Sequence, residues 1–438
     1  MEKISKPKMN KRKSVPTLDI EDMFSTQETH KLQVRCCVGI LPWRKPSEEA
    51  TNEEDREKRA YEVWVSEVML QQTRVQTVIN YFNRWMQKWP TLHHLALASL
   101  EEVNEMWAGL GYYRRARFLL EGAKMIAEGG SEFPDTTSAL LKVRGIGNYT
   151  ARAIASIAFN EAVPVVDGNV IRVLARLKAI SANPKDSVSI KNFWSLAAQL
   201  VDPVRPGDFN QSLMELGATI CTPLSPSCSS CPVSDQCRAH SIAKNDNSVS
   251  VTIYPTKVVK AKQREEFSAV CFLEILGGKG ISAGKVADSM FLLVKRPDDG
   301  LLAGLWEFPS VMLDGETDST VRRKAIDQFL KKTFKLDPRK THKISLREDV
   351  GEFVHIFSHI RLKIYVEILT LHLKDGSNGL FGKCDDKTLS WKCVDGETLS
   401  NTGLTSGVKK VYTMVQKFKQ SRLAVDSLPA RKRRKKEL

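Results

Sequence analysis

The stretch Leu-Leu-Lys-Val-Arg-Gly-Ile-Gly-Asn-Tyr-Thr-Ala occupies residues 140–151 of this 438-residue chain. It has an apolar helix end, two glycines around one apolar residue, and the start of another helix. Gly145 and Gly147 permit a tight turn whose backbone N–H groups point outward beside a helix N-terminus, which makes a seat for a phosphate. We interpret the stretch as a helix-hairpin-helix. Taken alone, it also fits a plain connection between two helices.

Helical periodicity extends on both sides of this hairpin, from Leu41 to about His240. After Thr73, apolar residues recur at three- and four-residue spacing, which marks the buried face of an amphipathic helix. Comparable faces occur around residues 114–127, 150–158, 169–180 and 190–201. We therefore expect a mostly α-helical domain over residues 35–242.

Two acidic residues in this helical part are candidates for chemistry. Glu67 lies in an apolar helical setting, and a buried glutamate usually needs a partner or a chemical task. Asp167 lies in Val-Val-Asp-Gly-Asn, just ahead of a helix that carries Arg172 and Arg176. An aspartate at such a place is most often only a helix N-cap, so Asp167 alone predicts no chemistry.

Four of the nine cysteines are crowded into one short stretch, Cys221, Cys228, Cys231 and Cys237. Their C-x6-C-x2-C-x5-C spacing suits either a tetrahedral zinc ion or a [4Fe–4S] cluster. Zinc ribbons usually separate two close cysteine pairs by a longer loop, whereas a single compact hairpin supplies all four here. The spacing therefore favours an iron–sulfur cluster with a structural role. We interpret the other five as ordinary thiols: Cys36, Cys37, Cys271, Cys384 and Cys393.

The pattern changes after a polar linker at residues 243–266. Beyond it, apolar residues alternate with a period of two, most clearly over residues 362–368, which is typical of β-strands. One helix interrupts these runs, with Val321, Ala325, Phe329 and Leu330 on its apolar face, and another spans about residues 406–419. We expect an α+β domain over residues 267–420.

The formal net charge is +15, and two tails carry most of it. The segments Met1–Ser14 and Arg431–Glu437 each contain six basic residues and one acidic residue, so each adds +5. We expect residues 1–34 to be a basic, disordered tail and residues 421–438 to be a second basic tail. The surplus fits a polyanionic partner such as nucleic acid, although a solvated charge surplus is as good an explanation.

The basic clusters Lys11-Arg12-Lys13 and 431–436 predict nuclear import. No apolar run approaches the length of a membrane span, and the N-terminus does not read as a secretory signal. We therefore expect a soluble, intracellular protein without a membrane partner.

Several runs together resemble the adenine DNA glycosylase (MutY) branch of the endonuclease III superfamily. They are SEVMLQQTRVQTV at 66–78, WAGLGYYRRAR at 107–117, GIGNYTA at 145–151, VPVVDGNVIRVLAR at 163–176 and FNQSLMELGA at 209–218. The cysteine spacing matches as well. The resemblance covers most of residues 41–240, and it implies a helix-hairpin-helix glycosylase domain with a [4Fe–4S] module at 221–237.

The family's activity would be the removal of adenine from duplex DNA after base flipping. The resemblance implies that Glu67 protonates adenine N7, while an ionised Asp167 stabilises the oxocarbenium-like sugar or captures it transiently. It assigns Tyr149 and Asn169 to orienting and polarising these groups. The expected substrates are duplexes with adenine opposite 8-oxoguanine or guanine, bound by a monomer that also meets repair and replication proteins.

Further residues would contact the DNA if the resemblance holds. Arg44, in Leu-Pro-Trp-Arg, would lie near the base pocket, and the hairpin glycines Gly145 and Gly147 would receive a phosphate. The positions that would wedge beside the oxidised guanine are Gln72, Thr73, Leu110 and Tyr112.

The second domain resembles the C-terminal domain of the same family, which has the Nudix fold and helps to recognise 8-oxoguanine. The resemblance rests on residues 296–309 and on Phe357-Ser358-His359. A Nudix hydrolase holds magnesium with a glutamate-rich helix, but the corresponding residues 322–332 contain no glutamate. We therefore expect this domain to read DNA rather than to hydrolyse nucleotides.

The chain departs from the family pattern at three places. Arg144 and Arg152 stand where the family usually has proline and glycine, and Arg152 would either crowd the hairpin helix or reach a phosphate. The third place is the run Val34–Ile40 directly before Leu-Pro-Trp, where the family has a longer helix with a Trp-Tyr pair.

Two other functions compete with a monofunctional glycosylase. A bifunctional glycosylase and lyase needs a lysine for a Schiff base, and Tyr149 stands at that position, which disfavours strong lyase activity. A non-catalytic DNA-binding protein would have lost Glu67 or Asp167, and both are present.

Overall fold

The computed structural model describes residues 41–44, 52–130, 132–258, 262–276, 289–336, 343–372 and 390–426. The basic clusters at 11–13 and 431–436 and the segment before Leu41 lie outside these residues, so the predictions made on them stay predictions.

The chain divides into two compact units. The first unit is Met1–Glu67 with Glu128–Val258, and the second is Val68–Ala127 with Val259–Leu438. Helix α2 (Glu53–Leu70) contributes to both units, because the division falls between Glu67 and Val68. The chain therefore does not divide at a single point in the sequence.

Helices make up the region where helical periodicity was found. The first unit also contains α7 (Thr137–Leu140), α8 (Asn148–Ala158), α9 (Gly168–Leu177), α10 (Ser187–Leu200), α11 (Pro206–Glu215) and α12 (Arg238–Asn245). The second unit begins with α3 (Val75–Lys88), α4 (Leu92–Ala96), α5 (Leu100–Trp107) and α6 (Arg114–Glu128). In α3 the buried residues are Val78, Phe82 and Trp85, which confirms the predicted face. None of the helices described is both long and apolar enough to cross a membrane.

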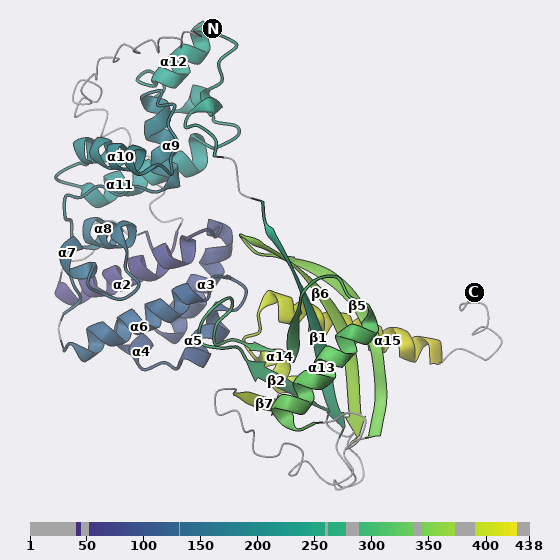
Figure 1. The fold of residues 1–438 in the computed structure, drawn as a ribbon. Helices are drawn as coiled ribbons and strands as arrows, with labels where there is room; N and C mark the ends of the chain where they lie inside the picture. The colour runs from purple at the N-terminus through teal and green to yellow at the C-terminus, as the bar shows by residue number, and fades with distance from the viewer. Residues whose placement is uncertain are drawn as a thin grey trace, which may run out of the picture. The chain divides into compact units, whose positions relative to one another are not determined.

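The rest of the second unit is a seven-stranded sheet with helices on both faces (Figure 1). Its strands are β1 (Arg264–Leu276), β2 (Ser289–Lys295), β3 (Trp306–Glu307), β4 (Ser310–Leu313), β5 (Lys343–Ile356), β6 (Ile360–His372) and β7 (Trp391–Val394). The order is β3-β2-β1-β6-β5, with β4 paired to β1 and β7 to β2. Only the β1–β6 pair is parallel among the described pairs. Strand β1 begins at Arg264, inside the segment predicted to be a linker.

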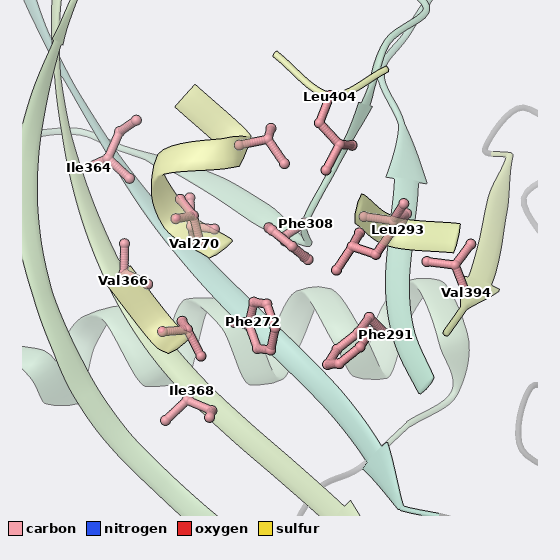
Figure 2. Packing of buried hydrophobic residues seen from close by; sticks show 14 of the residues in the cluster. Val270, Phe272, Phe291, Leu293, Phe308, Ile364, Val366, Ile368, Val394 and Leu404 are labelled. Atoms are coloured by element: carbon pink, nitrogen blue, oxygen red, sulfur yellow. The ribbon is translucent and has the colours of Figure 1, made fainter. Parts of the chain in front are cut away.

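Strand β1 is buried on both faces, because successive side chains point into different hydrophobic clusters. Val270 and Phe272 point toward α14 (Gly396–Asn401) and α15 (Ser406–Asp426), where Phe272 packs against Phe291 and Phe308 (Figure 2). Cys271 and Leu273 point toward α13 (Ser319–Phe334). A strand segment covered on both faces is expected to be apolar, as β1 is from Ala269 to Leu273.

The two helices predicted in this domain exist, but their details differ. The buried face of α13 is Ile326, Leu330 and Phe334, whereas Val321, predicted to be on that face, is 47% exposed. The prediction was right for Leu330, which is buried, and for Phe329, which packs against the same cluster. It was wrong for Val321, and it missed Ile326 and Phe334, because the position of the sheet decides which apolar side chains of the helix are covered. Helix α15 extends to Asp426, beyond the predicted end at residue 419.

Candidate active site

Glu67 projects from α2 into the interior of the first unit, where it is only 7% exposed. The hydroxyl of Tyr149, at the start of α8, donates a hydrogen bond of 2.5 Å to Oε2 of Glu67. Burial raises the pKa of Glu67, although the Tyr149 hydrogen bond and the charge of Arg44 oppose the rise. The negative charge of Asp167 raises the pKa further. Glu67 is thus an acid that keeps its proton to higher pH than an exposed glutamate does.

Asp167 is the N-cap of α9. Its negative charge also acts on the carboxyl group of Glu67. Its carboxylate accepts hydrogen bonds from the backbone N–H groups of Asn169 and Val170, both at 2.8 Å, and from Asn169 Nδ2 at 2.7 Å. Burial raises the pKa of Asp167, while the hydrogen bonds from Val170 and Asn169 oppose the rise. The interpretation of Asp167 as a helix cap is therefore correct but incomplete.

The two carboxyl groups have different surroundings. Among the described residues, one hydroxyl donates to Glu67, whereas three N–H groups donate to Asp167. Donors aimed at a carboxylate stabilise its ionised form, and burial without them stabilises the neutral form. The geometry therefore makes Glu67 the better proton donor and Asp167 the better anion.

The segment that carries Asp167 is held by residues that the sequence analysis did not single out. Asn210 is 1% exposed, accepts from the Val165 backbone N–H at 3.1 Å and donates to Val163 O at 2.9 Å. Gly217 lies so close to α9 that a Cβ atom there would approach Asn169 Cβ to 2.6 Å. Asn210 lies among other polar residues in α11, so its residue type carried little signal in the sequence.

Arg44 lies in the same unit and forms an ion pair with Glu215, at the end of α11. Both side chains are mostly buried, at 13% and 16% exposure. The positive charge of Arg44 lowers the pKa of Glu67, so Arg44 lies near enough to act on the acid. The structure thus brings together Glu67, Asp167, Tyr149, Asn169 and Arg44, the predicted residues around the reacting base.

The hairpin has the backbone that its glycines predicted. Gly145 has φ of +85°, a left-handed conformation that favours glycine, and Gly147 is the N-cap of α8. Arg152 does not crowd α8, because its guanidinium lies 5.1 Å from the ring centroid of Trp194 on α10. The contact is a cation–π interaction that fills the space beside a helix otherwise almost wholly buried.

The four predicted metal ligands, Cys221, Cys228, Cys231 and Cys237, line one small cavity. Burial raises the pKa of the Cys231 thiol to about 11, and the neighbouring thiols add to the rise. Arg176 is 1% exposed and donates to Cys221 Sγ at 3.3 Å and to the carbonyls of Cys221, Thr222, Pro223 and Tyr254. Within the described ranges, no three His, Cys, Asp or Glu side chains are already in metal-binding geometry.

The predicted wedge residues lie in the second unit. Gln72 and Tyr112 both have left-handed backbones, with φ of +57° and +48°, and the Tyr112 hydroxyl donates to Gln72 Oε1 at 2.5 Å. Tyr112 is 48% exposed, whereas Leu110 is buried at 8% exposure. Thr73 is half-buried and donates to Gln71 O at 3.3 Å.

Arg115 supports both strained loops, and sequence reasoning missed it. It donates to Gln71 O at 2.5 Å and to Gly111 O at 3.3 Å, one residue before Gln72 and Tyr112 respectively. Burial lowers the pKa of Arg115 to about 10. Its place in the Tyr-Tyr-Arg-Arg-Ala-Arg run looked like one of several solvated arginines, so the sequence carried no distinguishing signal.

Phe357, Ser358 and His359 form the turn between β5 and β6, also in the second unit. The Phe357 backbone N–H donates to Ile360 O at 2.8 Å, which closes the turn. Ser358 and His359 are exposed at its tip, with Ser358 Oγ 3.1 Å from His359 Nδ1. Polar groups are therefore presented outward on a short hairpin.

Comparison with known proteins agrees with this geometry. Residues 65–199 match the HhH-GPD superfamily of base excision DNA repair proteins, and residues 285–414 match the NUDIX domain. The adenine DNA glycosylase of Mus musculus is 44% identical over 414 residues, which cover 87% of this chain and 76% of that protein. This chain belongs to the adenine DNA glycosylase family.

Two more similarities give the extent of the match. The adenine DNA glycosylase of Arabidopsis thaliana is 59% identical over 420 residues, covering 90% of this chain but 65% of that protein, so the chain spans less than two thirds of its length. A solved thermostable thymine-DNA glycosylase is 24% identical with a TM-score of 0.43, covering 51% of this chain and all of that one. The predicted fold class, a helical HhH-GPD part and a Nudix-like α/β part, is confirmed by the family matches.

In this adenine DNA glycosylase family member, arginines occupy the helix that carries glutamates in Nudix hydrolases. Arg322 stacks on Tyr365 at 4.3 Å from the ring centroid, and together with Asp349 they line a cavity of about 110 Å³. Arg323 forms ion pairs with Asp349 and Glu367. The carboxylates of Asp349 and Glu367 at this cavity are therefore already paired with arginine side chains.

Glu67→Gln should stabilise the folded protein at pH 8 and have little effect near pH 5. Because the pKa of Glu67 is raised above its ordinary value of 4.5, the folded chain binds more protons than the unfolded chain just above that pH. Stability of the native sequence therefore falls as pH rises through this window, by about 1.4 kcal/mol for each unit of pKa difference, and glutamine removes the loss. Urea unfolding at both pH values tests this, with the exposed Glu132→Gln as control. An equal effect at the two pH values would contradict it.

Proposed function

We propose that this protein is a monofunctional adenine DNA glycosylase that hydrolyses the N-glycosidic bond of an adenine extruded from duplex DNA. The observation that carries the proposal is a pair of carboxyl groups in unlike surroundings, the buried Glu67 and the half-buried Asp167, in a chain of this family. Cleavage of this bond builds positive charge on the sugar and negative charge on the base. Two carboxyl groups with different proton affinities serve the two ends.

Glu67 delivers its proton to adenine N7, which turns the base into a better leaving group. Its raised pKa leaves a larger fraction protonated than an exposed glutamate would have at the same pH, and the hydroxyl of Tyr149 orients the carboxyl group. Arg44 limits the rise in pKa, because its charge favours the ionised form that remains after proton transfer.

Asp167 stabilises the cationic sugar after the bond breaks. Its three hydrogen bonds hold the carboxylate in one orientation, so no reorganisation is needed as charge develops. Water then completes the hydrolysis. Tyr149 stands at the position of the Schiff-base lysine of a lyase, and its hydroxyl donates a hydrogen bond to Glu67.

Glu67→Gln and Asp167→Asn should each abolish adenine release while changing duplex binding by less than about tenfold, because both residues act on chemistry rather than docking. Single-turnover assays on a duplex with adenine opposite 8-oxoguanine, with binding measured in parallel, provide the test. A wild-type rate in either variant would refute the role proposed for that residue.

We also propose that Cys221, Cys228, Cys231 and Cys237 hold a [4Fe–4S] cluster. Four thiols line one cavity, and the buried cation Arg176 donates to Cys221 Sγ at 3.3 Å, so a positive charge lies beside the proposed ligands. The bound cluster supplies four iron–thiolate bonds that would cross-link residues 221–237. Its proposed role is structural, since no catalytic residue comes from this loop.

The purified protein should contain about four irons per chain and absorb broadly near 400 nm. Metal analysis after preparation without air tests this proposal. One zinc and no iron would show that the site is the tetrahedral alternative.

The Nudix-like part is proposed to recognise 8-oxoguanine opposite the adenine, with guanine as a poorer partner. The exposed hydroxyl and backbone groups of Ser358 can bond to base edges that differ between the two guanines. One such difference is worth about 1–3 kcal/mol.

Ser358→Ala should lower the ratio of the cleavage rates for adenine opposite 8-oxoguanine and opposite guanine by roughly tenfold, the effect of about 1.4 kcal/mol. Removal of residues 267–438 should lower the same ratio, and it also weakens binding to both duplexes through lost phosphate contacts. The ratio is therefore the quantity to compare. An unchanged ratio in both proteins would mean that the helical part alone senses the lesion.

Nuclear import through the clusters 11–13 or 431–436 is a further part of the proposal, consistent with a DNA substrate and with repair or replication proteins as partners. Reporter fusions with and without each cluster should accumulate in the nucleus only when a cluster is present. A fusion that stays cytosolic in every form would contradict this.

A further inference from the structure

The turn at Phe357-Ser358-His359 needs support from outside itself. Its internal contacts are the Phe357 N–H to Ile360 O hydrogen bond and the proximity of Ser358 Oγ to His359 Nδ1. Neither of these contacts fixes the angle between the turn and the two strands that carry it. A hydrogen bond to a base requires its donor and acceptor to be placed within a few tenths of an ångström. Residues that fix the tilt therefore affect what the turn can recognise.

One support comes from the residues at the start of β1. Gln263 Nε2 donates to Phe357 O at 2.8 Å, and the Arg264 backbone N–H donates to His359 O at 3.0 Å. The two accepted carbonyls lie immediately before and after Ser358. This placement follows from the parallel pairing of β1 with β6, in which Arg264 lies opposite Ile360. The hydrogen bond from Arg264 uses a main-chain N–H and does not depend on the arginine side chain. The hydrogen bond to Phe357 O requires the side-chain amide of Gln263.

The other support comes from His355, two residues before Phe357 on β5. The two rings meet edge to face, with centroids 4.6 Å apart and an interplanar angle of 64°. Behind His355 lies α15, where a Cβ atom on Gly407 would be 3.7 Å from His355 Nδ1. The imidazole thus fills the space between α15 and the Phe357 ring and limits movement of that ring.

We propose that Gln263 and His355 are positioning residues for base discrimination: they hold the turn from two sides so that Ser358 is presented in one orientation. The proposal rests on the function proposed above for that turn. Neither residue is assigned a contact with DNA. Their effect on adenine release passes through Ser358, so they govern the preference between opposing bases rather than the chemistry.

The test uses the full-length chain and single-turnover rates on two duplexes, with adenine opposite 8-oxoguanine and opposite guanine. Gln263→Met keeps the length of the side chain but removes the donor, and His355→Ala removes the ring. Each should lower the ratio of the two rates about fivefold to tenfold, the size expected for one lost hydrogen bond, while the rate opposite guanine stays within about twofold. His355→Phe should retain the ratio, because it keeps the edge-to-face contact. Gln328→Met, exposed on α13, is the matched control.

The double variants separate positioning from a general structural effect. Adding Gln263→Met to Ser358→Ala should lower the ratio by less than Gln263→Met does in the native sequence, since the hydroxyl that the amide positions is gone and only the backbone groups of residue 358 remain. Equal loss of both rates in Gln263→Met or His355→Ala would mean simple destabilisation and would overturn the inference. So would an unchanged ratio in those variants when Ser358→Ala lowers it, or a loss in His355→Phe as large as in His355→Ala. If Ser358→Ala itself leaves the ratio unchanged, the proposed reading function of the turn is what fails.

Discussion

The burial of the Glu67 carboxyl group against Tyr149 is the constraint on which the candidate site depends. A carboxyl group at 7% exposure loses its hydration, so its neutral form is favoured unless donors replace the water. In the described part of the chain a single hydroxyl does so, at 2.5 Å. Helix α2 supplies the acid and the hairpin helix α8 supplies the hydroxyl. The same hairpin has the left-handed glycine, Gly145, that its sequence predicted.

Asp167 shows how the same unit keeps a second carboxylate different from the first. Its three donors come from its own helix start, and the close approach of Gly217 to Asn169 holds that helix start in place. Arg172 extends the contact, since it donates to Asn169 Oδ1 at 2.8 Å and to Cys221 O at 2.7 Å. The loop of the proposed cluster thus packs directly behind the residues that orient Asp167. A cluster with only a structural role would therefore still affect the orientation of Asp167.

The Nudix-like part is a sheet with helices on both faces and an exposed polar turn. On the helix α13, Arg322 stacks on Tyr365 and Arg323 forms ion pairs with Asp349 and Glu367. What the domain presents outward is the turn between β5 and β6. That turn is held by the start of β1 and by His355. A rigid scaffold with an exposed polar turn is suited to recognition.

The sequence by itself determined the helices, the hairpin and the α+β second domain, and it proposed the candidate site residues. These features depend on local signals: periodicity, glycine pairs, cysteine spacing and the runs shared with a family. It did not show that Val321 is exposed and Ile326 is buried on α13, because the position of the sheet decides which apolar side chains of the helix are covered. It did not reveal Arg115, Asn210 or Gln263 either, because each acts through a backbone group distant in sequence. Only the tertiary structure brings such partners together, since hydrogen bonds to main-chain atoms leave no complementary residue type to recognise.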